Sequence, residues 1–332
     1  MKDNKDRDEV LAAVKEDFLC RNPYKIEHVD ESLLKDREFV LAACKAAEVA
    51  KEAFEDYWYY DCGFEWGFPL LQYADESFRK DREIVMAAVK QDWNALEYAD
   101  KSLQKDKEIV MAAVEQSGYA LKYADESFQK DREFVLEVVR QPKSTNSGGP
   151  SGLALYFADE SLRKDREIVD SAVSNGFDFD DVDESLKKDK EIFMAAREYI
   201  IAAVEENGDA FSDAHESLRK DRECVLEVVR QNGYFLDYAD ESLKKDREIV
   251  LAAVQADING DSALDYADES LKKDREIVMA AVENNGFALE YADESLKKDR
   301  EIVMAAVKEN GDAFKYASEE LLNDPELKKL AY

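Results

Sequence analysis

Apolar residues recur along the chain at one spacing, three, four, seven and eight positions after an Asp. In one copy they are Ile84, Val85, Ala88 and Val89, which follow Asp81. This spacing puts them on one face of an α-helix of about 12 residues. An Asp at its start can accept hydrogen bonds from the free N–H groups of the first turn. The pattern therefore predicts a long helix that begins just after each such Asp.

A shorter helical segment is predicted after each long helix. It reads ALxYA and then DESLKK, and its apolar residues in one copy are Leu289, Tyr291, Ala292 and Leu296. Several long helices are followed by an Asn-Gly pair, where we expect the Gly to adopt the left-handed conformation that ends a helix. These pairs are Asn232-Gly233, Asn285-Gly286 and Asn310-Gly311. Each unit is therefore predicted to contain two helical pieces.

The two pieces belong to a repeat. The phrase YADESLKKDREIVMAAV is identical at residues 266–282 and 291–307, and its Asp recurs about every 25 residues. Two helices in so short a unit cannot bury their apolar faces alone, so the copies must stack. We predict an all-α fold, an α-solenoid of about twelve two-helix repeats. The charged KKDRE is the one part of the phrase that packing does not require, and it should form a ladder of mixed charge along one edge.

Insertions interrupt the period and suggest the domain organisation. We predict an N-terminal array at residues 1–141, a flexible loop at 142–152, and a C-terminal array at 153–332 that ends in a capping helix. The N-terminal array carries an aromatic insertion at about residues 45–72. Between Asp189 and Asp221 the apolar pattern is written twice, which predicts one extended helix of about 17 residues.

Copies of the form NGxALxYADESLKKDREIVxAAV resemble an uncharacterised repeat family, domain of unknown function 4116. The resemblance extends from about Asp6 to Asp324. It implies helical repeats and carries no active site.

The aromatic insertion is the first candidate site. It could anchor a partner or a small ligand, because Trp and Tyr dominate interface hot spots, or it could be a buried satellite core. The long helix of this copy is expected to run on to about Tyr60. The candidate residues are Tyr57, Trp58, Tyr59, Tyr60, Phe64, Trp66 and Phe68.

The second candidate site is a calcium loop at residues 257–268. Its carboxylate and amide side chains follow the spacing of an EF-hand loop, but Ser262 stands where that loop has Gly and its last ligand is Asp rather than Glu. The alternative is an ordinary repeat turn with three inserted residues. The candidate ligands are Asp257, Asn259, Asp261, Asp265 and Asp268. We expect no other cofactor.

The net charge of the chain indicates which kinds of partner it could bind. The chain has 46 Lys and Arg against 77 Asp and Glu, a net charge of −31. Such a surface repels nucleic acid and gains nothing from an anionic membrane. A protein partner with a basic surface is expected, unless the acidic residues only keep the array soluble. No apolar run is long enough to insert in a membrane and the N-terminus is polar, so we expect a soluble intracellular protein, in the cytoplasm or an organelle matrix.

No catalytic constellation stands out. Asp213, His215 and Ser217 are neighbours in sequence, but no nucleophile motif accompanies them. An acidic group, Asp178, Asp180, Asp181 and Asp183, is either a solvated face or a weak cation contact. We therefore predict a non-catalytic scaffold or protein–protein interaction module with a strongly acidic surface. The alternatives are a calcium- or cation-responsive binding protein and an enzyme built on a helical array; the oligomeric state is left open.

Overall fold

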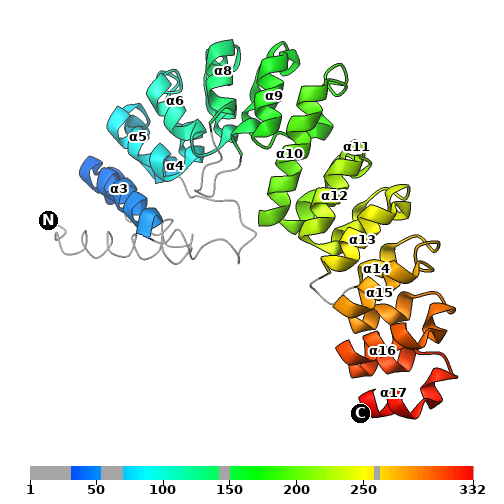
Figure 1. Cartoon of the computed structure of the whole chain (residues 1–332). Coiled ribbons are helices and arrows are strands. Elements are labelled where there is room, and N and C mark those ends of the chain that lie inside the picture. Colours follow the sequence, from blue (N-terminus) through cyan, green and yellow to red (C-terminus); the bar gives the residue numbers. More distant parts are fainter. Residues whose placement is uncertain (1–30, 54–69, 142–149, 258–261, 332) are drawn as a thin grey trace. The chain divides into compact units, whose positions relative to one another are not determined.

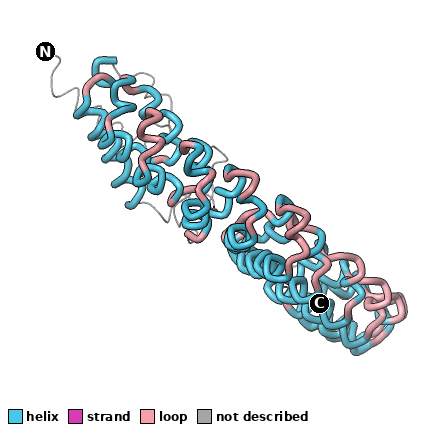
Figure 2. The backbone as a smooth tube through the Cα atoms, turned by 90° about the horizontal axis from the view of Figure 1, so that it is seen from above, coloured by secondary structure: helices cyan, strands magenta, loops and turns pink. Residues whose placement is uncertain are grey.

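The structure is a computed structural model that describes residues 31–53, 70–141, 150–257 and 262–331. All regular elements in these ranges are helices, which confirms the predicted all-α class (Figure 1). The helices are joined by short loops (Figure 2). The chain divides into two compact units, unit 1 at Met1–Phe193 and unit 2 at Met194–Tyr332.

Short α-helices and 3₁₀ helices (η) alternate with longer α-helices in both units. Unit 1 contains α2 (Glu31–Leu34), α3 (Arg37–Ala53), α4 (Leu70–Tyr73), η3 (Glu76–Lys80), α5 (Arg82–Gln91), η4 (Trp93–Tyr98), α6 (Lys107–Val114), η5 (Gly118–Tyr123), α7 (Glu126–Gln129), α8 (Arg132–Val139), η6 (Ser151–Phe157), η7 (Leu162–Lys164), α9 (Arg166–Ser174) and η8 (Phe179–Asp181). Helix α10 (Lys190–Glu206) carries the boundary between the units. Unit 2 continues with η9 (Gly208–Phe211), α11 (Glu216–Arg219), α12 (Arg222–Gln231), η10 (Gly233–Tyr238), η11 (Leu243–Lys245), α13 (Arg247–Gln255), α14 (Ala263–Tyr266), α15 (Arg275–Asn284), η12 (Gly286–Tyr291), η13 (Leu296–Lys298), α16 (Arg300–Glu309), η14 (Gly311–Tyr316), η15 (Leu321–Asn323) and α17 (Pro325–Ala331).

The long helices begin as the sequence predicts. Asp81 precedes α5, and its carboxylate accepts hydrogen bonds from the N–H groups of Glu83 (3.1 Å) and Ile84 (3.3 Å). The long helices α5, α6, α8, α9, α12, α13, α15 and α16 have 8 to 10 residues, fewer than predicted. Helix α10 has 17 residues, which confirms the extended helix.

The predicted apolar stripe forms the core. In α15 the buried side chains are Ile277, Val278, Ala281 and Val282. Helix α15 packs against α16, and both pack against η12, which lies between them in sequence. Two cysteines are buried in such stripes, and burial raises the pKa of the Cys44 and Cys224 thiols to about 12. Both are free thiols.

The glycines of the Asn-Gly pairs permit close backbone approach. Among the described residues, positive φ occurs at Gly176 alone (90°), so the predicted left-handed turns at the three pairs are wrong. Asn232 is extended, and its side chain accepts a hydrogen bond from the N–H of Tyr234 (3.1 Å), which starts η10. A Cβ on Gly233 would lie 2.1 Å from the carbonyl oxygen of Ala253 in α13. Glycine is needed here because two backbones touch.

Arginines of the KDRE phrase join each copy to the next. Arg82 of α5 donates from Nε to Asp106 Oδ2 (2.8 Å) and from Nη2 to Glu108. Since Asp106 also caps α6, one carboxylate starts a helix and binds the preceding copy. The Asp, Arg and Glu of KKDRE thus make contacts between copies, which the sequence analysis did not predict. We call this contact the arginine bracket, and it recurs at Arg37, Arg132, Arg166, Arg222, Arg247, Arg275 and Arg300.

The extended helix α10 preserves the bracket. Its first residue is Lys190, at the position that the bracket arginine takes in the copies named above; α6 likewise begins with a lysine, Lys107. Arg197, two turns further on, pairs instead with Glu223 of α12. The two residues are 26 apart, the same separation as between Arg82 and Glu108. The extra residues of α10 therefore place Arg197 at the distance in sequence from which it can bind Glu223 of the next long helix, as the bracket arginines do.

The bracket also affects the ionisation of the capping carboxyl groups. The Arg82 guanidinium, together with N–H groups of α6, holds the pKa of Asp106 below its usual value. The pKa is lowered in the same way at Asp81, Asp165, Asp189, Asp246, Asp274, Asp299 and Asp324. These carboxylates are therefore charged partners of the bracket at neutral pH.

A second link joins the DES segments. The N–H of Asp100 donates to the carbonyl oxygen of Arg79 in the preceding copy (2.8 Å). Its carboxylate accepts hydrogen bonds from the N–H (3.0 Å) and Oγ (2.7 Å) of Ser102. The same backbone bond is made by Asp125, Asp159, Asp240, Asp268 and Asp293. The Asp and Ser of the repeated phrase are thus used to hold one copy to another.

Candidate binding surface

The aromatic residues of the insertion lie outside the described residues, whereas its two ends, 45–53 and 70–72, are described. The residues outside include all seven candidates, Tyr57, Trp58, Tyr59, Tyr60, Phe64, Trp66 and Phe68. The structure describes α3 as far as Ala53, so the predicted extension to Tyr60 also falls beyond it. The anchor and satellite-core interpretations both stay predictions.

The predicted calcium loop is described only at its ends, since Asn259 and Asp261 lie outside the described residues. Asp257 is buried, and its Oδ2 accepts a hydrogen bond from the N–H of Ala263 (3.1 Å). Asp268 binds the N–H of Ser270 (3.0 Å), as the Asp of other DES segments does. In the described part of the chain, no three His, Cys, Asp or Glu side chains are grouped so that they could hold a metal ion.

Two other predicted features have local roles where they are described. The last two residues of the 142–152 segment, Ser151 and Gly152, are buried at the start of η6, while 142–149 lie outside the described residues. Within the acidic group, Asp178 accepts a hydrogen bond from the N–H of Asp180 (2.8 Å). His215 takes the place of a DES Asp, and its Nδ1 lies 2.6 Å from Oγ of Ser217.

In each unit, contacts between aromatic rings of successive copies form a surface that the sequence did not lead us to expect, and we call it the aromatic row. Each contact joins a ring at the start of the 3₁₀ segment of one copy to the Tyr position of the next, and we call it a ring pair. Trp93 stands at the Gly position itself, whereas Tyr119, Tyr234 and Phe287 come directly after it. The centroid distances are 6.2 Å for Trp93–Tyr123, 5.7 Å for Tyr119–Phe157, 5.7 Å for Tyr234–Tyr266 and 6.4 Å for Phe287–Tyr316. Tyr119 is 39% exposed, which is high for a large apolar ring in this chain.

The residue before each Tyr varies between copies and lies beside the rings. It is Lys in two copies, where the ammonium group lies over an aromatic face. Lys122 Nζ is 5.3 Å from the Tyr123 centroid, and Lys315 Nζ is 4.7 Å from that of Tyr316. In other copies this variable position holds Glu97, Asp237, Asp265 and Glu290. The variable position therefore carries a carboxylate in some copies and a lysine over a ring in two others.

Carboxylates of the row contact tyrosine hydroxyls of the neighbouring copy. Burial, the charge of Glu97 and a hydrogen bond to it raise the pKa of Tyr123 to about 12. One pair of copies has the tyrosine at the variable position and the carboxylate at the Tyr position of the next copy: there the Tyr156 hydroxyl donates to Asp181. Asp181 stands where other copies have Tyr, so the acidic group of the sequence analysis takes part in the row at this one position.

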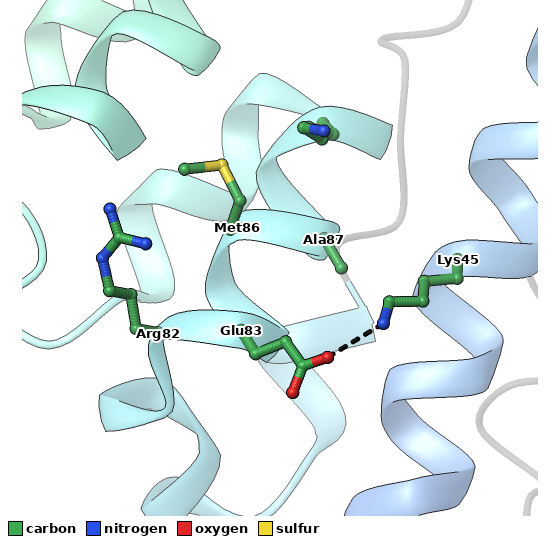
Figure 3. Close-up of a pocket in the computed structure, with 6 residues that line it drawn as sticks. Lys45, Arg82, Glu83, Met86 and Ala87 are labelled. Carbon is green, nitrogen blue, oxygen red and sulfur yellow. Dashed lines mark hydrogen bonds and ion pairs between the residues drawn. The ribbon is translucent and has the colours of Figure 1, made fainter.

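Shallow hollows between long helices form a different surface. One, of about 370 Å³, lies beside α5 and is lined by Met86, Ala87 and the ion pair of Lys45 with Glu83 (2.9 Å; Figure 3). A second, of about 500 Å³, is lined by Met279 and by residues of α16. Both methionines stand five residues after a capping Asp. The methionine of these hollows therefore stands at the same position of the repeat in both cases, whereas the residue type at the variable position of the aromatic row changes between copies.

Eight segments of the chain match the model of one family, described as Domain of unknown function (DUF4116). They are residues 6–47, 47–104, 106–146, 197–244, 221–272, 246–297, 274–322 and 299–331. The chain therefore belongs to this family of tandem repeats, as its repeated phrase predicts. No curated protein and no solved structure matches the chain.

Within the described ranges, none of the helices combines the length and the apolar character needed to span a bilayer.

The ring pairs had a signal in the sequence that could have revealed them. Each pair joins residues separated by about one copy length, so their contact follows once copies stack in register. The variable position was visible as well, since Asp237, Glu290 and Lys315 interrupt otherwise similar copies.

Proposed function

We propose that this chain is a non-catalytic repeat scaffold, an α-solenoid of about twelve repeats, whose aromatic row binds a basic segment of a partner protein. One observation carries the proposal: residues shared by the copies are used to join copies, while residues that differ are exposed beside the rings. Arg82, Asp106 and Glu108 illustrate the first group, and Asp265 and Glu290 the second.

The chemistry of the row supports a basic partner. Carboxylates attract cations, and aromatic faces bind ammonium and guanidinium groups. The net charge of −31 adds a long-range attraction that increases the association rate at low salt. Because a single exposed ion pair contributes little, we expect affinity from several adjacent copies acting together.

Calorimetric titration of the full chain with a lysine-rich peptide tests the proposal. We compare two double variants. The first combines Asp265→Asn and Glu290→Gln and removes two charges from the row. The second combines Glu283→Gln and Glu309→Gln and removes two exposed charges near the second hollow. The first double variant should lose at least about threefold in affinity and the second much less, since close charges dominate at physiological salt.

Each result bears on a different part of the proposal. Equal losses in the two double variants would mean that only the net charge matters, and the row would then have no role. A wild-type chain that binds a glutamate-rich peptide as well as the lysine-rich one would contradict the basic partner.

A further inference from the structure

We propose that the tyrosines Tyr234, Tyr238 and Tyr266, together with Asp237 and Asp265, form a binding site for a lysine side chain of a partner protein. We call the three rings the tyrosine trio. The Tyr234 centroid lies 5.6 Å from that of Tyr238 and 5.7 Å from that of Tyr266, with interplanar angles of 85° and 80°. The inference rests on the proposed function and names the ligand of one part of the row.

Another ring pair of unit 2 contacts an ammonium group of the chain itself. Phe287 and Tyr316 meet at the same interplanar angle, 80°, as Tyr234 and Tyr266. Between them lies the ammonium group of Lys315, 5.6 Å from the Phe287 centroid and 4.7 Å from that of Tyr316. The negative charge of Glu290, from the preceding copy, is among the causes that raise the pKa of Lys315, after its contact with the Tyr316 hydroxyl. Two rings and a carboxylate thus bind the chain's own lysine.

Unit 1 has a related ring pair, in which the two rings are stacked at 29° rather than edge to face. Trp93 and Tyr123 form the ring pair, Lys122 lies over Tyr123 at 5.3 Å, and Glu97 of the preceding copy supplies the carboxylate. In both cases the lysine comes from the variable position just before the second tyrosine. The lysine over the second ring is therefore common to both units, while contact of the lysine with both rings of a pair occurs at Phe287 and Tyr316.

The tyrosine trio has the rings and the carboxylate but a different residue at the variable position. Asp265 stands where the other two sites have Lys315 and Lys122, and its side chain is exposed. Asp237 of the preceding copy corresponds to Glu290 and Glu97. A hydroxyl contact with Tyr234 and the charge of Asp237 are among the causes that raise the pKa of Tyr238, and Asp265 directly precedes Tyr266 in the sequence. Two carboxylates at these positions attract a cation, so we expect the ammonium group to come from a partner protein.

The ring arrangement favours an organic ammonium group over a metal ion. A third ring, Tyr238, is fixed beside Tyr234 by a hydroxyl–hydroxyl contact of 3.2 Å. Aromatic faces attract ammonium groups through their quadrupoles, whereas calcium requires six or more oxygen ligands. A lysine reaches such a site on a flexible stem, and the aspartates at its rim compensate its charge.

The experiment fills the site with a lysine of the chain itself. Asp265→Lys copies the residue found in the other two sites, so its side chain should occupy the trio. Titration with a lysine-containing peptide should then show at least about tenfold weaker binding than wild type. Glu283→Lys makes the same charge change beside the second hollow and should cost much less. Circular dichroism checks that both variants are folded.

A reciprocal variant tests the inference without filling the trio. Lys315→Asp removes the internal ammonium group from Phe287 and Tyr316 and should create a second site, so the peptide should bind at least about twofold more tightly or in higher stoichiometry. Equal losses in Asp265→Lys and Glu283→Lys, with no gain in Lys315→Asp, would overturn the inference while leaving the proposed function intact. Failure of the wild-type chain to bind any lysine-rich peptide would overturn both.

Discussion

Gly233→Ala is expected to destabilise the array by about 3 kcal/mol, at the upper end of what overpacking costs. The new Cβ would lie 2.1 Å from the carbonyl oxygen of Ala253, a backbone atom of α13 that no side-chain rotation can move away. The N–H of Gly233 donates to Ala256 in the same region (3.2 Å), so separating the two copies would also break this hydrogen bond. Urea unfolding followed by circular dichroism measures the loss, and amide exchange should rise first in η10 and α13.

Gly208→Ala is the matched control. Gly208 also follows an Asn and begins a 3₁₀ helix, but its nearest neighbour would be Cζ of the Phe235 side chain at 3.4 Å, an ordinary contact. We expect a change within about 0.5 kcal/mol for this variant, as for most surface substitutions. Similar losses at the two positions would show that close approach of the copies is not the reason for glycine at Gly233.

Leu289→Ala is expected to cost about 2–5 kcal/mol, the usual range for a buried leucine. Leu289 is 0% exposed in η12, which packs between α15 and α16. The cavity would therefore weaken the contact of this segment with two long helices. In a repeat array, stability is approximately a sum of nearest-neighbour terms, so the loss should appear as early unfolding of this region.

Leu330→Ala provides the comparison for this substitution. Leu330 lies in α17 and is 44% exposed, so the same truncation removes little buried surface there. Its effect should stay within about 0.5 kcal/mol in the urea experiment. If the two leucine variants unfolded at the same urea concentration, the 3₁₀ segments would not belong to the core.

Local features of the fold could be predicted from the sequence because each depends on a few neighbouring residues. The capping Asp81 is an example, since its partners are the N–H groups two and three residues later. The length of α10 is another, because its apolar pattern is written twice in succession with only Arg197-Glu198 between the two runs. Such features need no knowledge of how the copies are placed.

Features that depend on contact between copies were missed or misinterpreted. A glycine after a helix is typical of either a left-handed turn or a close backbone contact. The position of the Ala253 carbonyl oxygen shows that Gly233 makes a close backbone contact, and the sequence does not reveal this position. The bracket of Arg82 escaped notice because its partners are 24 and 26 residues away. The ring pairs and the tyrosine trio are of the same kind, so the candidate site emerged only with the structure.

The most direct test of the account is a nuclear magnetic resonance titration of the full chain, labelled on tyrosine rings and methionine methyl groups, with the lysine-rich peptide. The tyrosines report on the aromatic row and the methionines on the hollows between long helices, which include Met86, Met279 and Met304. We predict that signals of Tyr238 and Tyr266 shift while those of the three methionines do not. Shifts of the methionine signals with unchanged tyrosines would contradict the claim that the aromatic row is the binding surface.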